Sequence, residues 1–254
     1  MKYYYRKAPN QQDARFFPPH IHDVAEAYVH IDGDASFMVE NKIYKLSSGD
    51  IVLSKPNEIH HCILNSTSTH KHLCFWFSNA LNALYPELFT SSEPSSRLIV
   101  PTNEVKEILL DCYEELEKAS ILGEERVEFY TTLKILDLWS KSIGKTAQAQ
   151  NPPRLLRDIL NDINENFTEI NSLNYFTEKY FISSSTLNRL FQTHLHTSPK
   201  VYLETKRLAY SRTLLREGSS VFDACMKSGF PDYSNYIRLF KKHFSITPKQ
   251  YRDR

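Results

Sequence analysis

The sequence predicts a two-domain α+β protein, in which a β-barrel or jelly roll is followed by an all-α domain with two helix-turn-helix motifs. Three observations predict this fold class. Short alternating strands separated by turns occupy much of the first hundred residues. Further along the chain, apolar residues recur at helical spacing instead. Near the C-terminus one segment occurs twice, with 49 residues between equivalent positions.

The strands are predicted from about residue 16 to residue 100. Apolar or alternating runs occupy Ala35–Val39, Ile51–Ser54 and Leu73–Phe77. The turn sequences that separate such runs are Asp32-Gly33-Asp34, Asn41-Lys42, Ser48-Gly49-Asp50 and Pro56-Asn57. Many short strands at this spacing favour a sandwich or barrel, with jelly rolls among the candidates.

Two amphipathic helices are expected after the strands. The apolar stripe of the first follows a potential cap at Thr102-Asn103 and consists of Val105, Ile108, Leu109, Cys112 and Leu116. The stripe of the second follows Gly123 and consists of Phe129, Leu133, Ile135, Leu136 and Trp139. Both stripes can pack on the β-domain, and two stripes offer more than one face for burial.

The C-terminal part of the chain is predicted to be helical throughout. The expected helices cover Leu173–Tyr180, Ser184–His194, about Pro199–Glu217, Val221–Lys227 and Tyr233–His243. Ser172, Ser183 and Asp232 stand where N-cap side chains are expected before three of them. Gly218 ends the longest helix, and Gly229 suits a left-handed position after the next one.

These elements divide the chain into four parts. The β-domain covers residues 1–100, the helical pair 101–144, a linker 145–153 and the helical domain 154–254. The linker is polar and lacks apolar periodicity, which is typical of a flexible connection. It ends at Pro152-Pro153, where a new helix can begin at Arg154.

The repeat places Leu187–Phe191 in correspondence with Tyr236–Phe240, and Pro199 with Pro248. Each copy fits a helix-turn-helix, so the pair could engage two successive major grooves of one DNA duplex. A connecting helix of about 19 residues spans roughly 28 Å. This length is compatible with the roughly 34 Å of one DNA turn.

Each repeated helix has a core-facing stripe and a polar face. Leu187, Leu190 and Phe191 lie at i, i+3 and i+4 and share one side of the first helix. The corresponding set in the second is Tyr236, Leu239, Phe240 and Phe244. Arginine and asparagine can read base edges, whereas lysine and serine can hold phosphates. The predicted DNA-binding residues are Ser185, Thr186, Asn188, Arg189, Gln192, Tyr233, Ser234, Ile237, Arg238 and Lys241.

Charge supports a nucleic-acid partner for one end of the chain. The net charge is only +1, but residues 154–254 hold 16 basic and 10 acidic side chains, a net +6. The preceding residues hold 15 basic and 20 acidic side chains, a net −5. A basic domain on an acidic body indicates that only this domain meets a polyanion.

Composition predicts a cytoplasmic protein without a membrane partner. With 41% hydrophobic and 24% charged residues, the chain resembles an ordinary globular protein. No apolar run approaches the roughly 20 residues of a membrane span, and the N-terminus lacks a signal-peptide pattern. The four cysteines, Cys62, Cys74, Cys112 and Cys225, show neither CxxC spacing nor clustering, which favours a reducing compartment.

The helical domain closely resembles the AraC/XylS family of bacterial transcription activators. The matching stretch is Gly229–Phe244, followed by Thr247-Pro248 and Tyr251-Arg252. The first copy matches the partner motif from Ser183 to Phe191, and again at Ser198-Pro199 and Tyr202. The residues that depart from the family pattern are Thr177 and Cys225 for alanine, His196 and Ser245 for a turn glycine, and Asn235 for an aromatic residue.

The N-terminal domain resembles the cupin-type sensor of the same family. The matching segments are Pro19–Asp23 with Glu26, Gly49-Asp50-Ile51 and Pro56–His60. The resemblance implies a cupin-like jelly roll and a homodimer formed through the helical pair. It also implies sequence-specific promoter DNA, RNA polymerase and a small-molecule effector, such as a sugar, as partners. The sequence offers no set of residues that indicates catalysis, so no enzymatic activity is expected.

The resemblance assigns effector binding to His20, His22, Glu26 and His60. In metal-binding cupins a His-x-His-x3-Glu group and a later histidine converge on one divalent cation, and these ligands suit zinc, nickel, manganese or iron. Sensor cupins of the AraC/XylS family instead use such residues as pocket groups for organic effectors. We therefore expect an effector pocket that requires no metal or other cofactor. Three further histidines, His61, His70 and His72, are expected at the surface. Five aromatic residues are expected mostly in the core, and one or two of them could line an effector cavity: Phe37, Tyr44, Phe75, Trp76 and Phe77.

Three functional hypotheses follow. The first is an effector-responsive transcription regulator, an activator of a small-molecule utilisation operon. The second is a cupin metalloenzyme or metal sensor with a DNA-binding appendage, which bound metal and substrate turnover would support. The third is a DNA-binding protein whose β-domain serves only assembly, which would be favoured if no small molecule changed its stability.

Overall fold

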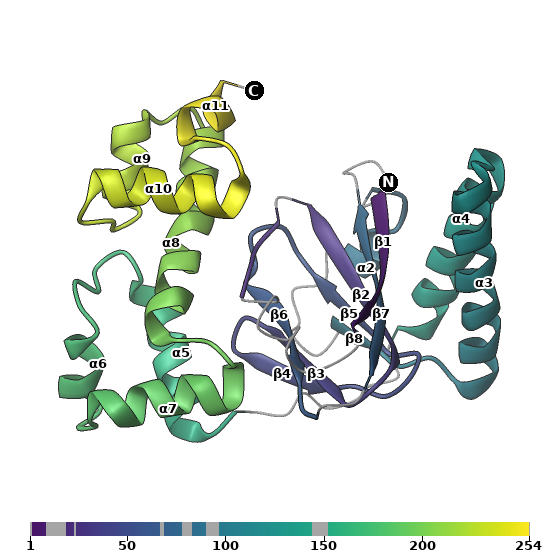
Figure 1. The fold of residues 1–254 in the computed structure, drawn as a ribbon, viewed down its shortest axis with the longest axis horizontal. Coiled ribbons are helices and arrows are strands. Elements are labelled where there is room, and N and C mark those ends of the chain that lie inside the picture. Colours follow the sequence, from purple (N-terminus) through teal and green to yellow (C-terminus); the bar gives the residue numbers. More distant parts are fainter. Residues whose placement is uncertain are drawn as a thin grey trace. The chain divides into compact units, whose positions relative to one another are not determined.

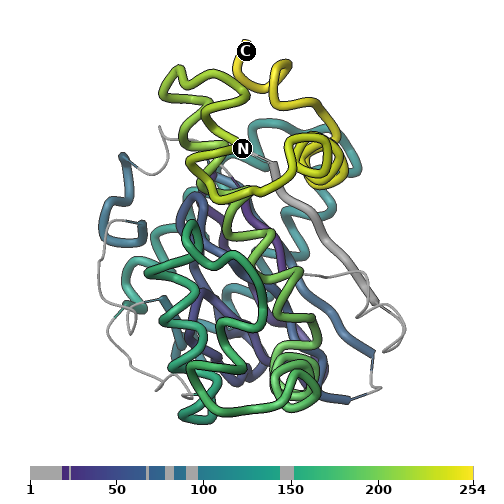
Figure 2. The backbone as a smooth tube through the Cα atoms, turned by 90° about the vertical axis from the view of Figure 1, so that its left-hand side faces the viewer, coloured from purple at the N-terminus to yellow at the C-terminus, as the bar shows by residue number. Residues whose placement is uncertain are grey.

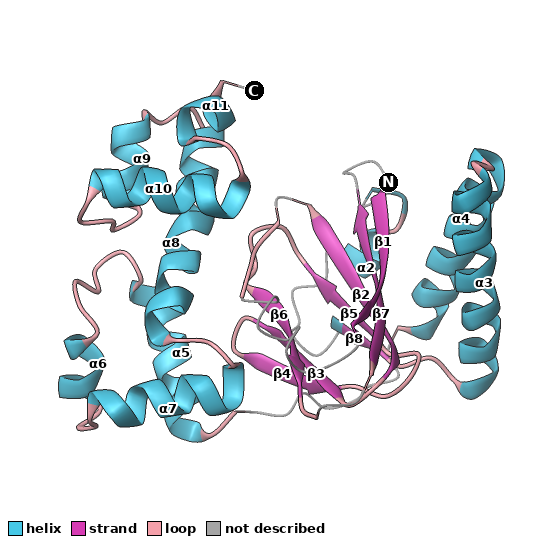
Figure 3. Ribbon diagram, in the orientation of Figure 1, coloured by secondary structure: helices cyan, strands magenta, loops and turns pink. Residues whose placement is uncertain are grey.

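The computed structural model describes residues 2–8, 19–22, 24–66, 69–77, 83–89, 97–143 and 152–253. The chain forms two compact units, one made mainly of residues before 144 and one mainly of residues from 152 onward. The first contains the strands and a pair of long helices, and the second is helical (Figure 3). The predicted α+β fold class is confirmed. Of the predicted linker, residues 145–151 lie outside the described residues.

The β-domain is built from two antiparallel sheets (Figure 1). Its strands are β1 (Lys2–Ala8), β2 (Ala25–Asp32), β3 (Ala35–Val39), β4 (Lys42–Lys45), β5 (Ile51–Ser54), β6 (His60–Leu64), β7 (His70–Phe77) and β8 (Leu98–Ile99). A short helix, α2 (Pro86–Phe89), precedes β8. One sheet has the order β1-β7-β2-β5-β8 and the other β4-β3-β6. Among the described strands the sheets do not join into a closed barrel, so the jelly-roll alternative describes the domain better.

The two faces of the five-stranded sheet bury different residues because side chains alternate along a strand. In β2, Ala25, Ala27 and Val29 belong to the core that also includes the long helices. Tyr28 lies on the opposite face and packs with Phe37 and other residues of the three-stranded sheet. The second core therefore lies between the sheets.

The helical pair consists of α3 (Asn103–Leu122) and α4 (Glu125–Ser142), joined at Gly123 in a left-handed conformation. Leu109, Leu136 and Trp139 are buried against the sheet, and the Trp139 indole donates a hydrogen bond to the Tyr113 hydroxyl at 3.1 Å. Thr102 occupies the N-cap of α3, but its side chain makes no capping hydrogen bond.

Two residues of the predicted stripes are exposed. Ile108 is 43% exposed and Phe129 is 58% exposed. These two residues do not pack on the sheet, which agrees with the expectation that the stripes offer more than one face for burial. The apolar character of α3 and α4 therefore exceeds what packing within one chain requires.

The helical domain has the elements that the repeat predicts. Its helices are α5 (Arg154–Asn166), α6 (Asn174–Lys179), α7 (Ser184–Leu195), α8 (Pro199–Arg216), α9 (Val221–Lys227), α10 (Tyr233–Phe244) and α11 (Pro248–Arg252). Ser183 and Asp232 cap α7 and α10 as expected, each accepting a backbone hydrogen bond. The prediction for Ser172 was wrong: α6 starts at Asn174 behind Leu173, and no side chain caps it.

Helix α8 joins the two helix-turn-helix motifs, as Figures 1 and 2 show from two directions. It is buried on several sides, and Leu208 and Leu215 belong to the core of the second motif. The buried Arg207 guanidinium donates hydrogen bonds to the carbonyl oxygens of Phe167 and Ile170. This helix therefore fixes the spacing between α7 and α10.

Candidate functional site

Helices α7 and α10 occupy equivalent places in the two helix-turn-helix motifs, and each is 12 residues long. Leu187 and Phe191 fix α7 through the core, as Tyr236 and Phe240 fix α10. Each helix thus has a rigid inner side and presents the opposite side to solvent. This is the arrangement that a recognition helix needs in order to enter a major groove.

Most of the predicted DNA-binding side chains lie on these outer faces. The exposed ones are Ser185, Asn188, Arg189, Gln192, Tyr233, Ser234, Arg238 and Lys241. Thr186 and Ile237 are half-buried. Ile237 also packs against the core of the second motif, so its side chain does not point fully outward as expected.

Local hydrogen bonds orient the outer face of α10. The Arg238 guanidinium donates a hydrogen bond to the Asn235 side-chain oxygen at 2.7 Å. Asn235 is one of the departures from the family pattern, and its amide holds the guanidinium in place. A preoriented arginine loses less side-chain entropy when it binds a base edge or a phosphate.

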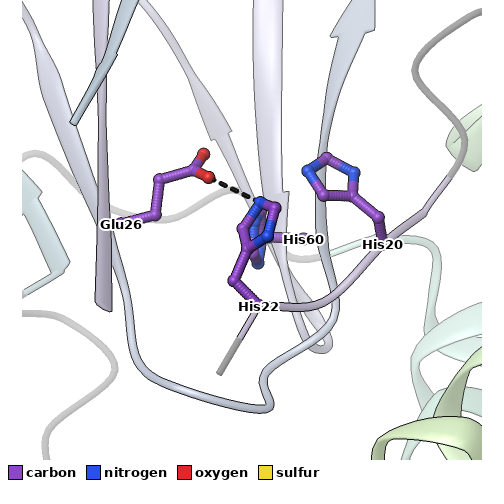
Figure 4. Close-up of side chains that lie close together, drawn as sticks. All are labelled: His20, His22, Glu26 and His60. Atoms are coloured by element: carbon purple, nitrogen blue, oxygen red, sulfur yellow. Dashed lines mark ion pairs between the residues drawn. The ribbon is translucent and has the colours of Figure 1, made fainter. Parts of the chain in front are cut away.

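The four predicted effector-binding residues lie close together in the structure (Figure 4). His20 and His22 lie in the segment before β2, Glu26 lies on β2, and His60 begins β6. One possible ligand atom from each of the four lies within 4.8 Å of the others. Two segments distant in sequence meet here because His20 and His60 form an isolated antiparallel bridge.

The Glu26 carboxylate organises this cluster. It is 2% exposed, pairs with His22 Nε2 at 2.8 Å and accepts a hydrogen bond from the Trp76 indole at 2.7 Å. The rings of His20 and His60 meet edge to face, with centroids 4.6 Å apart. Three imidazoles and one carboxylate can bind a hydroxyl-rich ligand by hydrogen bonds, or they can coordinate a transition metal.

Three histidines that were expected at the surface are buried. His61 and His70 are 1% exposed and His72 is 3% exposed. For His70 and His72 the prediction was wrong because β7 lies inside its sheet, where the second sheet covers the face that carries them. His61 lies on β6, and its buried Nε2 atom is 2.7 Å from the Leu195 carbonyl oxygen. The His70 Nε2 atom lies 2.6 Å from the Tyr28 hydroxyl, and burial lowers the pKa of His70 to about 4. His70 is therefore neutral at physiological pH.

The inner face of β2 and β7 carries a row of polar and aromatic groups that sequence reasoning missed. Glu26, Tyr28 and His30 alternate with the apolar residues of β2, and the ring of His70 stacks on the rings of His30 and His72. Trp76 belongs to this row and is half-buried beside Glu26, which agrees with the expectation that most, but not all, of the five aromatic residues lie in the core. The other four predicted core aromatics are buried.

A separate cavity of about 400 Å³ lies against α3, on the opposite face of the five-stranded sheet. Ile31, Leu73, Leu110 and Tyr113 form apolar walls, and Lys71 is among its charged groups. None of the four converging residues lines it. We place the candidate ligand site at the histidine–glutamate cluster because the cluster offers convergent donors and acceptors.

Comparisons with known proteins match both halves of the chain. Residues 4–128 match a family described as an AraC-like ligand binding domain, and residues 176–254 match a helix-turn-helix domain. The HTH-type transcriptional activator RhaS of Enterobacter sp. (strain 638) is 24% identical over 93% of this chain and 87% of the relative. The HTH-type transcriptional activator RhaR of Mannheimia succiniciproducens is 24% identical over 94% and 88%.

Several solved structures are similar to part of this chain. The C-terminal domain of the two-component response regulator yesN from Fusobacterium nucleatum is 31% identical, over 39% of this chain and 99% of that chain, with a TM-score of 0.38. Within the described residues, the chain contains no helix long and apolar enough to cross a bilayer.

Proposed function

The chain belongs to the AraC family of transcription regulators, and we propose that it activates transcription from its promoter when a small-molecule effector occupies the β-domain. Double-stranded promoter DNA is its partner through α7 and α10. The observation that carries this function is the pair of capped helices whose outer faces present Arg189 and Arg238. We assign it no catalytic activity.

The relatives' names support activation rather than repression, since RhaS and RhaR are named as transcriptional activators. An activator at a promoter works through RNA polymerase, which we therefore propose as a partner. We place the protein in the cytoplasm, where its four free thiols would stay reduced.

We propose that an organic effector binds at His20, His22, Glu26 and His60. The cluster supplies a buried carboxylate, which accepts hydrogen bonds, and three imidazoles, which can both donate and accept them. These groups suit the hydroxyls of a ligand such as a carbohydrate. The polar inner face of β2 and β7 continues from Glu26 past Tyr28. A ligand that enters between the sheets would find further hydrogen-bonding groups along this row.

Replacing His22 with alanine and Glu26 with glutamine tests this site. In a thermal-shift screen of sugars, small metabolites and divalent metals, the effector should stabilise the wild-type chain by about 2.7 kcal/mol at 100 times its Kd. The double variant should lose this stabilisation, because it lacks the ion pair and one imidazole. Basal DNA binding should persist, since His22 and Glu26 belong to one unit and α7 and α10 belong to the other. A full effector response in the double variant would refute the assignment.

A second candidate function is metal sensing, favoured by the convergence of four ligand atoms within 4.8 Å. His20, His22, Glu26 and His60 would hold a divalent transition metal, which would act as the effector or bind a chelating one. Elemental analysis of the purified protein distinguishes the two candidates. Stoichiometric zinc, nickel, manganese or iron that disappears in the double variant supports metal sensing, and its absence supports the organic effector.

We further propose that the protein is a homodimer formed through α3 and α4. Exposed apolar side chains gather near the turn that joins the two helices: Ile121 and Leu122 at the end of α3, and Phe129 and Tyr130 near the start of α4. Their exposed fractions range from 58% to 78%. A second copy of the same hairpin would remove these groups from water.

Replacing Ile121 and Phe129 with serine should shift the dimer to monomers in sedimentation experiments, with little loss of folding stability, because both side chains are exposed. It should also weaken binding to paired half-sites, where two linked domains bind with avidity. Leu84→Ser is the matched control, since Leu84 is 65% exposed outside the hairpin. A wild-type chain that stays monomeric at high concentration and on DNA would contradict the proposal.

A further inference from the structure

The turns of the two helix-turn-helix motifs have the same backbone hydrogen bonds, 48 residues apart. In the second motif, the Phe230 amide donates to the Cys225 carbonyl at 3.2 Å. In the first, the Ile182 amide donates to the Thr177 carbonyl at 3.1 Å. Such a bond from beyond a helix end requires a left-handed residue between the helix and the donor. The same turn is therefore built twice.

The left-handed residue differs between the two copies. The second motif uses Gly229, with φ of +82°, and the first uses Phe181, with φ of +52°. A left-handed backbone is strained for a bulky residue but not for glycine. The other non-glycine residues with positive φ in the described chain are polar or charged: Glu40, Asn57, His196 and Ser245.

Packing within the protein does not explain why a phenylalanine occupies this strained position. Its side chain is 94% exposed, the largest fraction among the exposed large apolar residues of the described chain. The ring therefore gains little from burial in the folded protein, while the backbone beneath it is strained. A strained residue that contributes little to folding points to a function outside the folded chain.

The position of Phe181 suggests what the ring contacts. It lies two residues before Ser183, the N-cap of α7, and the first turn of α7 carries Ser185 and Thr186. A recognition helix contacts base edges mainly through its N-terminal residues. When α7 enters a major groove, the turn that leads into it must lie beside the sugar–phosphate backbone at the edge of that groove.

Lys179, the positively charged residue nearest to this turn, is already engaged within the protein. The Lys179 amine lies 2.9 Å from the buried Asp162 carboxylate and 3.0 Å from the Tyr175 hydroxyl. These bonds hold Lys179 against α5 and α6. The Phe181 ring is thus the large exposed group that the turn presents next to α7.

We propose that Phe181 makes an apolar contact with the deoxyribose of a nucleotide flanking the bases that α7 reads. This inference rests on the proposed DNA-binding function. Apolar side chains, phenylalanine among them, insert between base steps in other protein–DNA complexes, so an exposed ring is a suitable apolar partner for DNA. The contact belongs to the first motif alone, because Gly229 occupies the equivalent place in the second. It makes the two motifs unequal and gives the protein a defined direction on its operator.

Phe181→Gly separates this role from a structural one. The variant restores the glycine found in the second motif, so the melting temperature of the full chain should rise. Affinity for a duplex selected from a random pool by the wild-type chain should fall on the order of tenfold, the loss of one good apolar contact. The salt dependence of binding should not change, because no charge is removed.

Ser245→Gly is the matched control. It relieves another positive φ, of +61°, at the far end of α10, and should raise the melting temperature without changing affinity. Hydroxyl-radical footprinting reports the contact directly. One deoxyribose at the edge of the α7 site should be protected by the wild type and by Ser245→Gly, and cleaved with Phe181→Gly.

Unchanged affinity and unchanged sugar protection in Phe181→Gly would overturn the inference. If Arg189→Ala still weakens binding in that case, the proposed DNA-binding function stands and only the role of Phe181 fails. A wild-type chain that selects no duplex at all would instead overturn the proposed function itself.

Discussion

Replacing both Arg189 and Arg238 with alanine should abolish detectable specific binding to the operator. Each guanidinium lies on the outer face of its recognition helix, and each is expected to contribute about 1–3 kcal/mol if it reads a base edge or holds a desolvated phosphate. The single variants should show the separate losses. The two helices are far apart in sequence and pack in different motifs. The two losses of binding free energy should therefore be nearly additive.

A control variant must show that the loss of a positive charge elsewhere in the protein does not weaken DNA binding. Lys118→Ala removes a side chain that is 74% exposed on α3, outside the helical domain, and should leave affinity unchanged. Gel-shift titrations at fixed salt measure the affinities, and thermal unfolding verifies that the variants remain folded. Unaltered operator affinity in both single variants would refute the assignment of α7 and α10 as recognition helices.

Gly229→Ala should destabilise the helical domain by about 3 kcal/mol or more, since two penalties add. The residue has φ of +82°, and a Cβ atom there would lie 2.5 Å from the Thr168 carbonyl oxygen and 2.8 Å from its Cα. Both atoms are backbone, so the chain must shift to make room. DNA binding should be lost together with folding of the second motif.

Gly218→Ala separates strain from steric overlap. Gly218 has φ of +91°, but no atom lies within 4 Å of an added Cβ. The free energy of unfolding of this variant should therefore fall only by the cost of a left-handed backbone at alanine, about 1–2 kcal/mol. Urea unfolding of both variants measures the difference. Equal destabilisation would show that the contact with Thr168 has no energetic consequence and would contradict this account of the turn.

Local signals in the sequence predicted the helical domain well. The caps Ser183 and Asp232 and the glycine at 229 act at short range, through hydrogen bonds and backbone conformations that one residue type favours. Ser172 shows the limit of this reasoning. It is a residue type suited to capping, but the helix begins two residues later, with Leu173 in a helical conformation at its N-cap.

Burial within the β-domain could not be predicted as well, because it depends on which sheet face another sheet covers. His70 and His72 are polar residues that usually lie at a surface, but their strand is inside its sheet. The alternation of Glu26, Tyr28 and His30 with Ala25, Ala27 and Val29 was a usable signal for a polar inner face.

In the helical pair, by contrast, some apolar residues of the predicted stripes are exposed. Periodicity assigned Ile108 and Phe129 to apolar stripes, but it could not distinguish burial within the chain from an exposed apolar surface. Leu109 and Leu136, from the same stripes, lie in the core instead. Substitutions at those two positions would test folding rather than assembly, whereas Ile121 and Phe129 test assembly.

The central claim is that one chain places α7 and α10 in two successive major grooves. Methylation interference at guanine N7, on a duplex selected by the wild-type chain, tests it most directly. We predict two clusters of interfering guanines about one helical turn apart, on one side of the duplex. Arg189→Ala should weaken interference within one cluster, and Arg238→Ala within the other. A single cluster, or equal loss from both clusters in each variant, would contradict the claim.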